Sequence, residues 1–371
     1  MSEFFLELFS EEIPPKLQIN ARIDLLKNFK NFFDENQINI TGNYNVFSTP
    51  NRLIICIDKV PKIVTKKSVE IRGPSINSSD EALKGFIRSN KLSKNQIYEK
   101  KTDKGVFYFY KKLSEKIETL DLLKKNLPNI LERISWNKSM KWGNYELFWG
   151  RPLKSILAIF DGKKIDFNFY HLKSSNHTII DKDLEEKTKN FNSFKAFNSY
   201  FKSQSILIDQ VKRRLFIENE LLKISTKNNL MLNFTNDFLD EISNIVERPK
   251  ILQCEFDKKY LVIPKEIIIT TMTNHQKYFP AFDEKGNITN IFFVVANTKD
   301  KQGVVKQGNE RVVEARLRDA EFFWKKNKNQ NLVKEVSKLK NINYFTGLGT
   351  YFDKVQRIRK LSSLISDEML I

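Results

Sequence analysis

The side chains of this chain best suited to chemistry are cations and aromatic rings, and they gather in two segments. The first, IPKEIIITTMTNHQKYFPAF, spans residues 263–282. Proline suits the first turn of a helix, so a helix from Pro264 would end near Asn274. The turn that follows would hold His275, Gln276, Lys277, Tyr278 and Phe279. Such an imidazole, amide and ammonium beside two rings can contact a phosphate and stack on a base.

A structural interpretation of the same segment stays open. In that interpretation Tyr278 and Phe279 belong to the hydrophobic core. His275 then caps the C-terminus of the helix, where the helix dipole favours a cation.

The second segment, GNERVVEARLRDAEFFWKKN, spans residues 308–327 and predicts a helix. Its charged residues recur at steps of three and four and form one face: Arg311, Glu314, Arg318, Glu321 and Lys325. Each glutamate stands four residues before a cation, the better orientation for helical ion pairs. An exposed pair contributes only about 0.3–0.5 kcal/mol, so stability explains little of the pattern. We expect this face to meet RNA or a partner subunit, with a solvated ladder of ion pairs as the alternative.

The sequence contains none of the common catalytic signatures. A G-x-S-x-G elbow, a Walker loop, a G-x-G-x-x-G fingerprint and an H-E-x-x-H helix are all missing from its 371 residues. GLGT at 347–350 is interpreted as a turn between helices rather than a phosphate cradle. Asp181 and Asp183 are the one local cue for a metal-dependent RNA hydrolase or nucleotidyltransferase. We therefore expect no catalytic and no metal-binding residue in this chain.

The composition is that of a globular, strongly basic protein. Hydrophobic residues make up 40% and charged residues 29%, which excludes a disordered chain. Lys and Arg number 63 against 45 Asp and Glu, a net charge of +18, and the pI is about 9.5. This excess favours a polyanionic partner, because phosphate contacts release counterions. Drift in an A+T-rich genome is the alternative source of the lysines.

The sequence also favours a cytoplasmic location. Its two cysteines, Cys56 and Cys254, provide no disulfide framework. No apolar run is long enough to cross a membrane, so no membrane partner is expected. The acidic start MSEFFLELFSEEIPP does not have the basic character of a signal peptide.

Strands and helices alternate irregularly along the chain, which predicts an α+β fold rather than a doubly wound sheet. We expect a mixed strand and helix N-terminal body, followed by a mainly helical C-terminal segment. The expected parts are a body at 1–180, a polar insertion or linker at 181–204, a helix-rich region at 205–340 and the start of a truncated helical domain at 341–371. A frayed terminal helix is the alternative for the last part.

Several segments, in the same order along nearly the whole chain, resemble the beta subunit of the bacterial heterotetrameric glycyl-tRNA synthetase. FFLELFSEEIPP is similar to that family's L-E-I-G-T-E-E-L-P, and NVFSTPNRLIICI to its F-x-T-P-R-R-L, with Asn51 in place of the first Arg. MKWG and GRPLKSILAIFDG resemble its M-R-W-G and R-P-x-x-W-L-x-A-L. The central block follows the family nearly residue for residue: ITTMTNHQKYFPAFDEKG, VVANT, GNERVVEARLRDAEFFW and GLGTYFDKVQRI. The family's G-H-R-F stretch has no clear counterpart at 172–184, which leaves the role of that loop open.

The resemblance implies a division of labour between two subunits. In this family the alpha subunit holds the class II active site, which uses ATP with Mg to form glycyl-adenylate and transfers glycine to tRNA. The beta subunit binds tRNA(Gly) in an alpha2-beta2 assembly. This chain would then be the non-catalytic part of a glycine–tRNA ligase, without a cofactor of its own. The family's anticodon-binding domain lies beyond the matched segments, so anticodon recognition is not assigned to these residues.

The matched segments add two arginines to the residues expected to contact tRNA or the partner subunit. The full set of candidates is His275, Gln276, Lys277, Arg311, Arg318, Lys325, Arg52 and Arg151. The alternative is a stand-alone RNA-binding or scaffolding protein descended from such a subunit.

Overall fold

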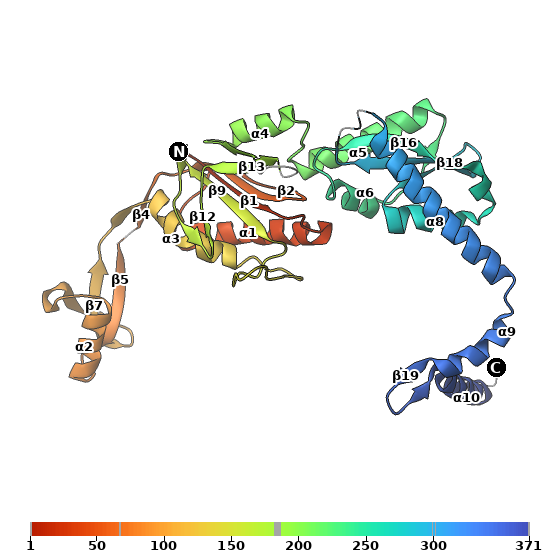
Figure 1. Cartoon of the computed structure of the whole chain (residues 1–371). Helices are drawn as coiled ribbons and strands as arrows, with labels where there is room; N and C mark the ends of the chain where they lie inside the picture. Colours follow the sequence, from red (N-terminus) through yellow and green to blue (C-terminus); the bar gives the residue numbers. More distant parts are fainter. Residues whose placement is uncertain (1, 67, 182–186, 299, 301, 370–371) are drawn as a thin grey trace. The chain divides into compact units, whose positions relative to one another are not determined.

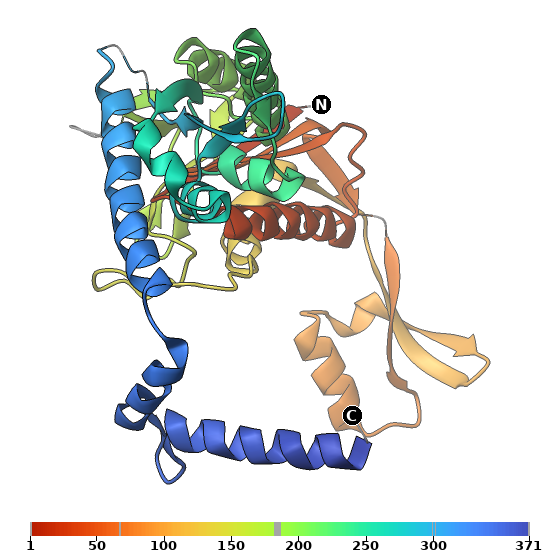
Figure 2. The same ribbon diagram turned by 90° about the vertical axis from the view of Figure 1, so that its right-hand side faces the viewer.

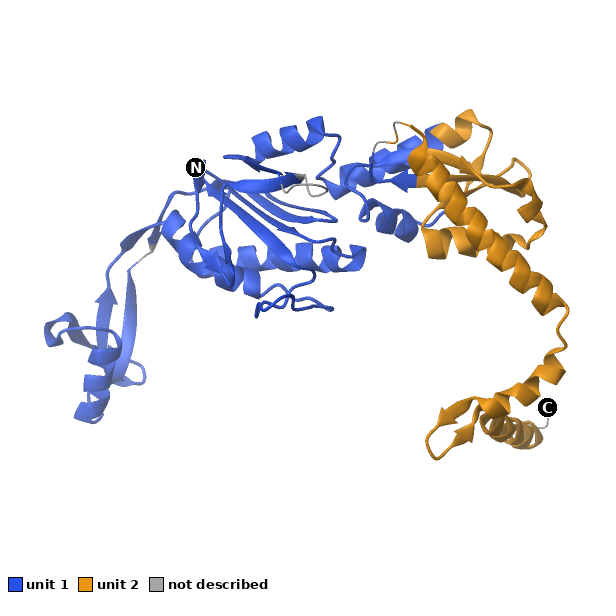
Figure 3. Cartoon of the chain, in the orientation of Figure 1, with its two compact units in different colours: residues 1–223, 234–251, 295–299 blue, residues 224–233, 252–294, 300–371 orange. Residues whose placement is uncertain are grey.

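A computed structural model describes residues 2–66, 68–181, 187–298, 300 and 302–369 of the chain (Figure 1). The fold is α+β, as the sequence predicts. The chain divides into two compact units (Figure 3). Unit 1 comprises residues 1–223, 234–251 and 295–299, and unit 2 comprises 224–233, 252–294 and 300–371. Of the helices that the structure describes, none combines the length and the apolar character that a membrane span requires.

Unit 1 is built on an antiparallel sheet whose central strand is covered on both faces. The strands, in sheet order, are β10 (Lys163–Lys164), β9 (Leu153–Phe160), β1 (Ser2–Ser10), β3 (Arg52–Val60) and β2 (Tyr44–Thr49). Phe4 of β1 packs among α1 (Pro15–Glu35) and α3 (Thr119–Glu132). Phe5 points to the opposite face and packs against Phe197 of α4 (Phe194–Ser203). The strand that opens the sequence is therefore the middle of the core.

Local sequence sets a helix start and a hairpin turn in unit 1, and the structure corrects the linker expected at 181–204. Pro15 opens α1, and Asp161 and Gly162 turn the β9–β10 hairpin with φ of +52° and +75°. Residues 187–204 do not form a polar linker, because α4 places Phe197 and Phe201 in the core with 0% exposure. The part of the expected linker at 182–186 lies outside the described residues.

A small sheet-and-helix module interrupts unit 1 between β3 and α3. Its strands and helices are β4 (Ile63–Lys66), β5 (Val69–Ser75), α2 (Asp80–Ser89), η1 (Lys94–Gln96), β6 (Ile97–Thr102), β7 (Gly105–Lys112) and β8 (Glu115–Glu118). β4 pairs with β8, and β5, β7 and β6 form a separate three-stranded sheet in that order. The α2 helix packs on one face of this sheet, where Phe86 meets the ring of Tyr110 with centroids 5.9 Å apart.

Short strands and two helices complete unit 1. They are β11 (Asn168–Phe169), β12 (Leu172–Lys173), β13 (His177–Asp181), β14 (Lys187–Asn190), α5 (Gln210–Lys227) and α6 (Asn236–Ser243). Ser205, with a positive φ of +64°, lies between the end of α4 and the start of α5 at Gln210. The last residues of α5, from Ile224, belong to unit 2.

Unit 2 packs one long helix on a second antiparallel sheet. The sheet order is β15 (Met231–Leu232), β17 (Phe279–Phe282), β18 (Ile288–Ala296) and β16 (Lys250–Glu255). The helical elements beside it are η2 (Lys258–Val262), α7 (Lys265–Thr270), η3 (Thr271–Gln276) and α8 (Val304–Lys328). Val313 and Leu317 of α8 reach 0% exposure against Phe292 of β18 and its neighbours.

The C-terminal part of unit 2 contains few buried side chains. Its elements are α9 (Leu332–Glu335), η4 (Val336–Asn341), β19 (Asn343–Phe345), β20 (Gly349–Thr350) and α10 (Tyr351–Met369). GLGT forms the turn of the β19–β20 hairpin, with positive φ at Gly347 and Gly349, so the segment is a turn, as expected, but between strands. No described side chain of α10 is buried.

Candidate nucleic-acid interface

The histidine segment predicted at the end of a helix lies in an unusual turn. α7 continues into η3, a π-helical turn that ends at Lys277, whose φ is +61°. A non-glycine residue in the left-handed region is uncommon, and π turns occur often at functional sites. His275 is exposed on this turn, while Gln276 and Lys277 are half-buried. The three polar candidates therefore remain together at the surface of unit 2.

The two rings beside that turn are core residues, so the structural interpretation is right for them. Tyr278 is 8% and Phe279 1% exposed. Tyr278 stacks on Phe292 with centroids 5.4 Å apart, and its hydroxyl donates a hydrogen bond to Asn309 of α8. The expectation that these rings stack on a base is corrected, because neither has a free face. Their role is to fix the π turn against α8.

The charged face predicted on α8 forms in part. Glu321 and Lys325 make the expected ion pair, with Oε1 and Nζ 2.5 Å apart. Arg318 is exposed, and a side-chain hydrogen bond with Tyr260 of η2 raises its pKa. Arg311 is also exposed and reaches the rim of a cavity.

That cavity, of about 490 Å³, has an acidic lining. The charged residues around it are Glu255, Asp257, Glu310, Glu314, Lys258 and Arg311. Four carboxylates face two cations, so the field beside Arg311 repels a phosphate. The cations best placed for a polyanion on α8 are therefore those beyond this cavity.

The C-terminal half of α8 joins exposed rings to exposed cations. Phe322 is 61%, Phe323 56% and Trp324 37% exposed. Lys325, Lys326 and Lys328 occupy the last turn, where the helix dipole favours positive charge. Rings beside lysines suit both single-stranded nucleic acid and a partner protein. The sequence analysis named only Lys325 among these residues, although the run FFWKKNK already places lysines directly after aromatic residues.

Arg52 is removed from the set of surface candidates, because it lies in the interior of unit 1. It is 2% exposed and forms an ion pair with the fully buried Glu7 of β1. Its guanidinium also donates to the Thr178 hydroxyl at 2.9 Å and to the Ile179 carbonyl at 2.6 Å. Burial raises the pKa of Glu7, and Arg52 opposes that rise. The pair joins β1, β3 and β13.

Arg213 is a second interior arginine, which sequence analysis missed. It has 0% exposure, and burial lowers its pKa to about 10. It donates hydrogen bonds to four backbone carbonyls, those of Leu207, Ile208, Ser243 and Ser48. The available signal was its spacing, because Arg213 precedes the buried Ile217 and Leu221 at steps of four. Arg151, by contrast, is half-buried in the loop before β9 and donates to the Gly150 carbonyl at 2.8 Å.

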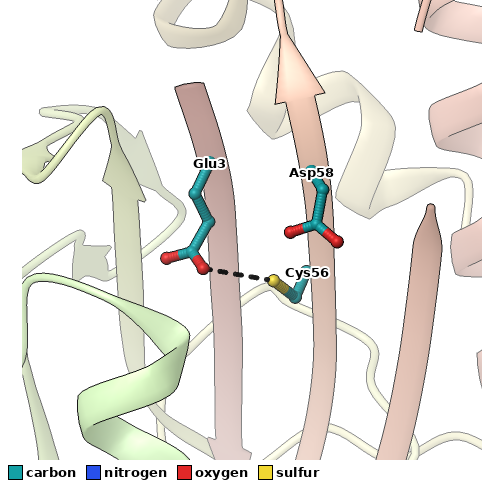
Figure 4. Close-up of side chains that lie close together, drawn as sticks. All are labelled: Glu3, Cys56 and Asp58. Carbon is teal, nitrogen blue, oxygen red and sulfur yellow. Dashed lines mark hydrogen bonds between the residues drawn. The ribbon is translucent and has the colours of Figure 1, made fainter. Parts of the chain in front are cut away.

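One group of possible metal ligands occurs among the described residues (Figure 4). Glu3 of β1 lies beside Cys56 and Asp58 of β3. The Cys56 thiol donates to Glu3 Oε2 at 3.7 Å, and burial raises the thiol's pKa. The other Glu3 oxygen accepts from the Phe194 backbone amide at 2.8 Å, at the start of α4. These contacts describe a protonated thiol and a helix cap rather than ligands of an ion. Asp183 of the Asp-x-Asp pair lies outside the described residues.

Comparison with known proteins identifies the family of the chain. A family model described as glycyl-tRNA synthetase beta subunit matches residues 4–371. The chain belongs to the glycyl-tRNA synthetase beta subunit family. The glycine–tRNA ligase beta subunits of Rickettsia canadensis and Rickettsia conorii are each 34% identical to it over 367 residues, which is 99% of this chain and 55% of the relative. That of Rickettsia felis is 34% identical over 370 residues. The chain thus spans about half the length of these relatives.

Proposed function

We propose that this chain acts as part of a glycine–tRNA ligase, in which it binds tRNA(Gly) and docks on an alpha subunit that holds the active site. Family membership across residues 4–371 is the observation that carries the proposal. The net charge of +18 supports a polyanionic partner. The proposed assembly is cytoplasmic and contains two copies of each subunit.

The proposed role of the chain is to position the RNA. ATP, Mg and the glycyl-adenylate belong to the alpha subunit in this proposal. Holding the acceptor end of a tRNA in the right orientation removes an entropic part of the barrier, which is worth several kcal/mol in favourable cases. The surface elements that support this role in unit 2 are the π turn with His275 and the C-terminal half of α8.

Salt-dependent binding of tRNA tests the proposal. Purified chain, alone and with the alpha subunit, is titrated with tRNA(Gly) at increasing salt. Affinity should fall steeply, with a log–log slope close to the number of phosphates neutralised. Binding that is absent, or that does not respond to salt in the presence of the alpha subunit, would refute it.

A glycylation assay separates a ligase subunit from a stand-alone RNA-binding protein. The alpha subunit, ATP, glycine and tRNA are mixed with and without this chain. A ligase subunit must raise the rate of glycylation above that of the alpha subunit alone. Tight tRNA binding without any increase in rate would favour the stand-alone protein.

A further inference from the structure

The three-stranded sheet β5-β7-β6 in unit 1 has one face under α2 and an opposite, exposed face (Figure 2). Tyr110 points toward α2, where its ring meets Phe86 and its hydroxyl donates to Asn90 at 3.2 Å. Residues directly opposite each other in a sheet share a face. The strand register therefore places the following residues together on the other face: Glu70, Arg72, Tyr98, Lys100, Phe107, Phe109 and Lys111.

Aromatic rings and cations interleave on this open face. Tyr98 is 37% exposed and stacks beside Phe109, with centroids 6.4 Å and planes 26° apart. The Arg72 guanidinium carbon lies 3.4 Å from the centroid of Phe107, and the Lys100 ammonium 5.6 Å from that of Phe109. Bases stack on aromatic rings and also on guanidinium planes. The face therefore offers two stacking positions, the Tyr98 ring and the Arg72 guanidinium, from the strands on either side of Phe109.

Glu70 holds two of these side chains in place. It accepts a hydrogen bond from the Tyr98 hydroxyl at 2.8 Å and forms an ion pair with Lys100. Three cations, Arg72, Lys100 and Lys111, face this single carboxylate. The whole module at 63–118 has thirteen Lys and Arg against seven Asp and Glu, a net charge of +6. A ligand that alternates flat rings with negative charges matches this surface in both respects.

We propose that the open face of β5-β7-β6 binds a single-stranded segment of RNA. Its bases stack on Tyr98 and on Arg72 above Phe107, and its phosphates meet Lys100 and Lys111. The inference rests on the RNA-binding part of the proposed function and adds that unpaired nucleotides are what this module takes. A duplex has no bases free to stack, so it fits the face less well.

The decisive test compares two variants of the full chain at Tyr98. Y98F keeps the ring and Y98L removes it, while both lose the hydrogen bond to Glu70. Fluorescence anisotropy with a labelled oligoadenylate about ten nucleotides long measures affinity. Y98L should bind about tenfold more weakly than wild type, and Y98F within about twofold, because base stacking needs the ring. Circular dichroism melting of both variants checks that each one folds.

A second comparison uses neighbouring lysines on opposite faces of β7. Lys111 lies on the open face and Lys112 on the other, and both are exposed. K111Q and K112Q change the net charge equally. K111Q should weaken oligoadenylate binding about threefold at low salt and K112Q should not, since only Lys111 meets the strand.

The outcomes that follow would contradict the inference. Equal affinities for Y98L and Y98F, or equal losses for K111Q and K112Q, would overturn it. If Y98L weakens the complex with the alpha subunit but not with oligoadenylate, the face is a protein-docking surface instead. If wild type binds tRNA(Gly) but not oligoadenylate, this inference fails while the proposed function stands.

Discussion

Arginine has opposite roles in the interior of unit 1 and on the long helix of unit 2. Arg52 and Arg213 are 2% and 0% exposed, and their guanidinium groups bond to a carboxylate, a hydroxyl and backbone carbonyls. Arg311 and Arg318 on α8 are exposed, and the helix contacts its core through Val313 and Leu317 instead. A net positive charge therefore does not locate a surface suited to a polyanion unless the buried cations are left out of the count.

The difference follows from whether the charged side chains of an element are buried or hydrated. β1 and β3 are joined by a charge pair that is buried away from water, so either partner alone would be a buried, unpaired charge. The charged side chains on α8 remain hydrated, so removing one of them leaves no buried group without its partner. Substitutions of the buried arginines of unit 1 should accordingly change stability, and those of the exposed cations on α8 should change binding. The predictions that follow test this contrast, beginning with the largest effect.

Replacing Arg52 by methionine should destabilise unit 1 by about 3–5 kcal/mol, because Glu7 would remain buried without its partner. Urea unfolding followed by circular dichroism measures the loss. The tRNA affinity of the molecules that stay folded should not change. The double variant E7Q/R52M removes both charges and should recover much of the stability. A weaker tRNA complex with little loss of stability would return Arg52 to the surface candidates and break the contrast.

Replacing Arg213 by methionine should cost about 2–4 kcal/mol. Its four carbonyl acceptors, which join α5 to β2 and to the end of α6, would lose their donor in the interior. The adjacent Arg214 is the control, since it pairs with Glu218 and Asp240 nearer the surface. R214M should cost less than about 1 kcal/mol. Similar losses for the two variants would contradict a special role for Arg213.

The contrast also shows where sequence reasoning succeeds. Local patterns predicted the helix within residues 308–327, the turn at 347–350 and the ion pair of Glu321 with Lys325. Each of these depends on residues close together in the chain. Family motifs in the expected order also predicted the family, which the family model confirms.

Contacts between residues far apart in the chain could not be predicted from the sequence. Glu7 and Arg52 are 45 residues apart, so nothing local announces that they pair. Phe197 and Phe201 lie in a charged stretch yet reach 0% exposure, whereas Phe322 and Phe323 lie in a family motif and remain more than half exposed. The same residue type is core or surface according to which distant element covers it. The open face of β5-β7-β6 could likewise be read only after the register of its strands was known.

Replacing Lys325 and Lys326 by glutamine should weaken tRNA binding about tenfold with little change in stability. Both belong to the exposed last turn of α8. The log–log salt slope should fall by about one for each lysine that contacts a phosphate. Lys223 and Lys227, exposed near the end of α5, provide a control with the same loss of charge. An equal loss for the two double variants would show a response to net charge alone, and α8 would then have no specific part in binding.

The smallest expected effect concerns a half-buried histidine of unit 1, which should also resist taking up a charge. His171 stacks on Tyr145 with ring centroids 3.7 Å apart, and burial lowers its pKa. In the unfolded chain a histidine takes up a proton near pH 6.5, whereas the folded site resists protonation until the pH is lower. The unfolded state therefore binds more protons in this window, and stability falls as the pH drops below about 6.5.

The variant H171F keeps a ring on Tyr145 but cannot titrate, so its urea midpoint should fall less between about pH 7.5 and 5.5 than that of wild type. Y145L opens the site to water and should also reduce the fall. If all three proteins respond to pH alike, the penalty on charge is confined to the fully buried arginine sites and does not extend to His171.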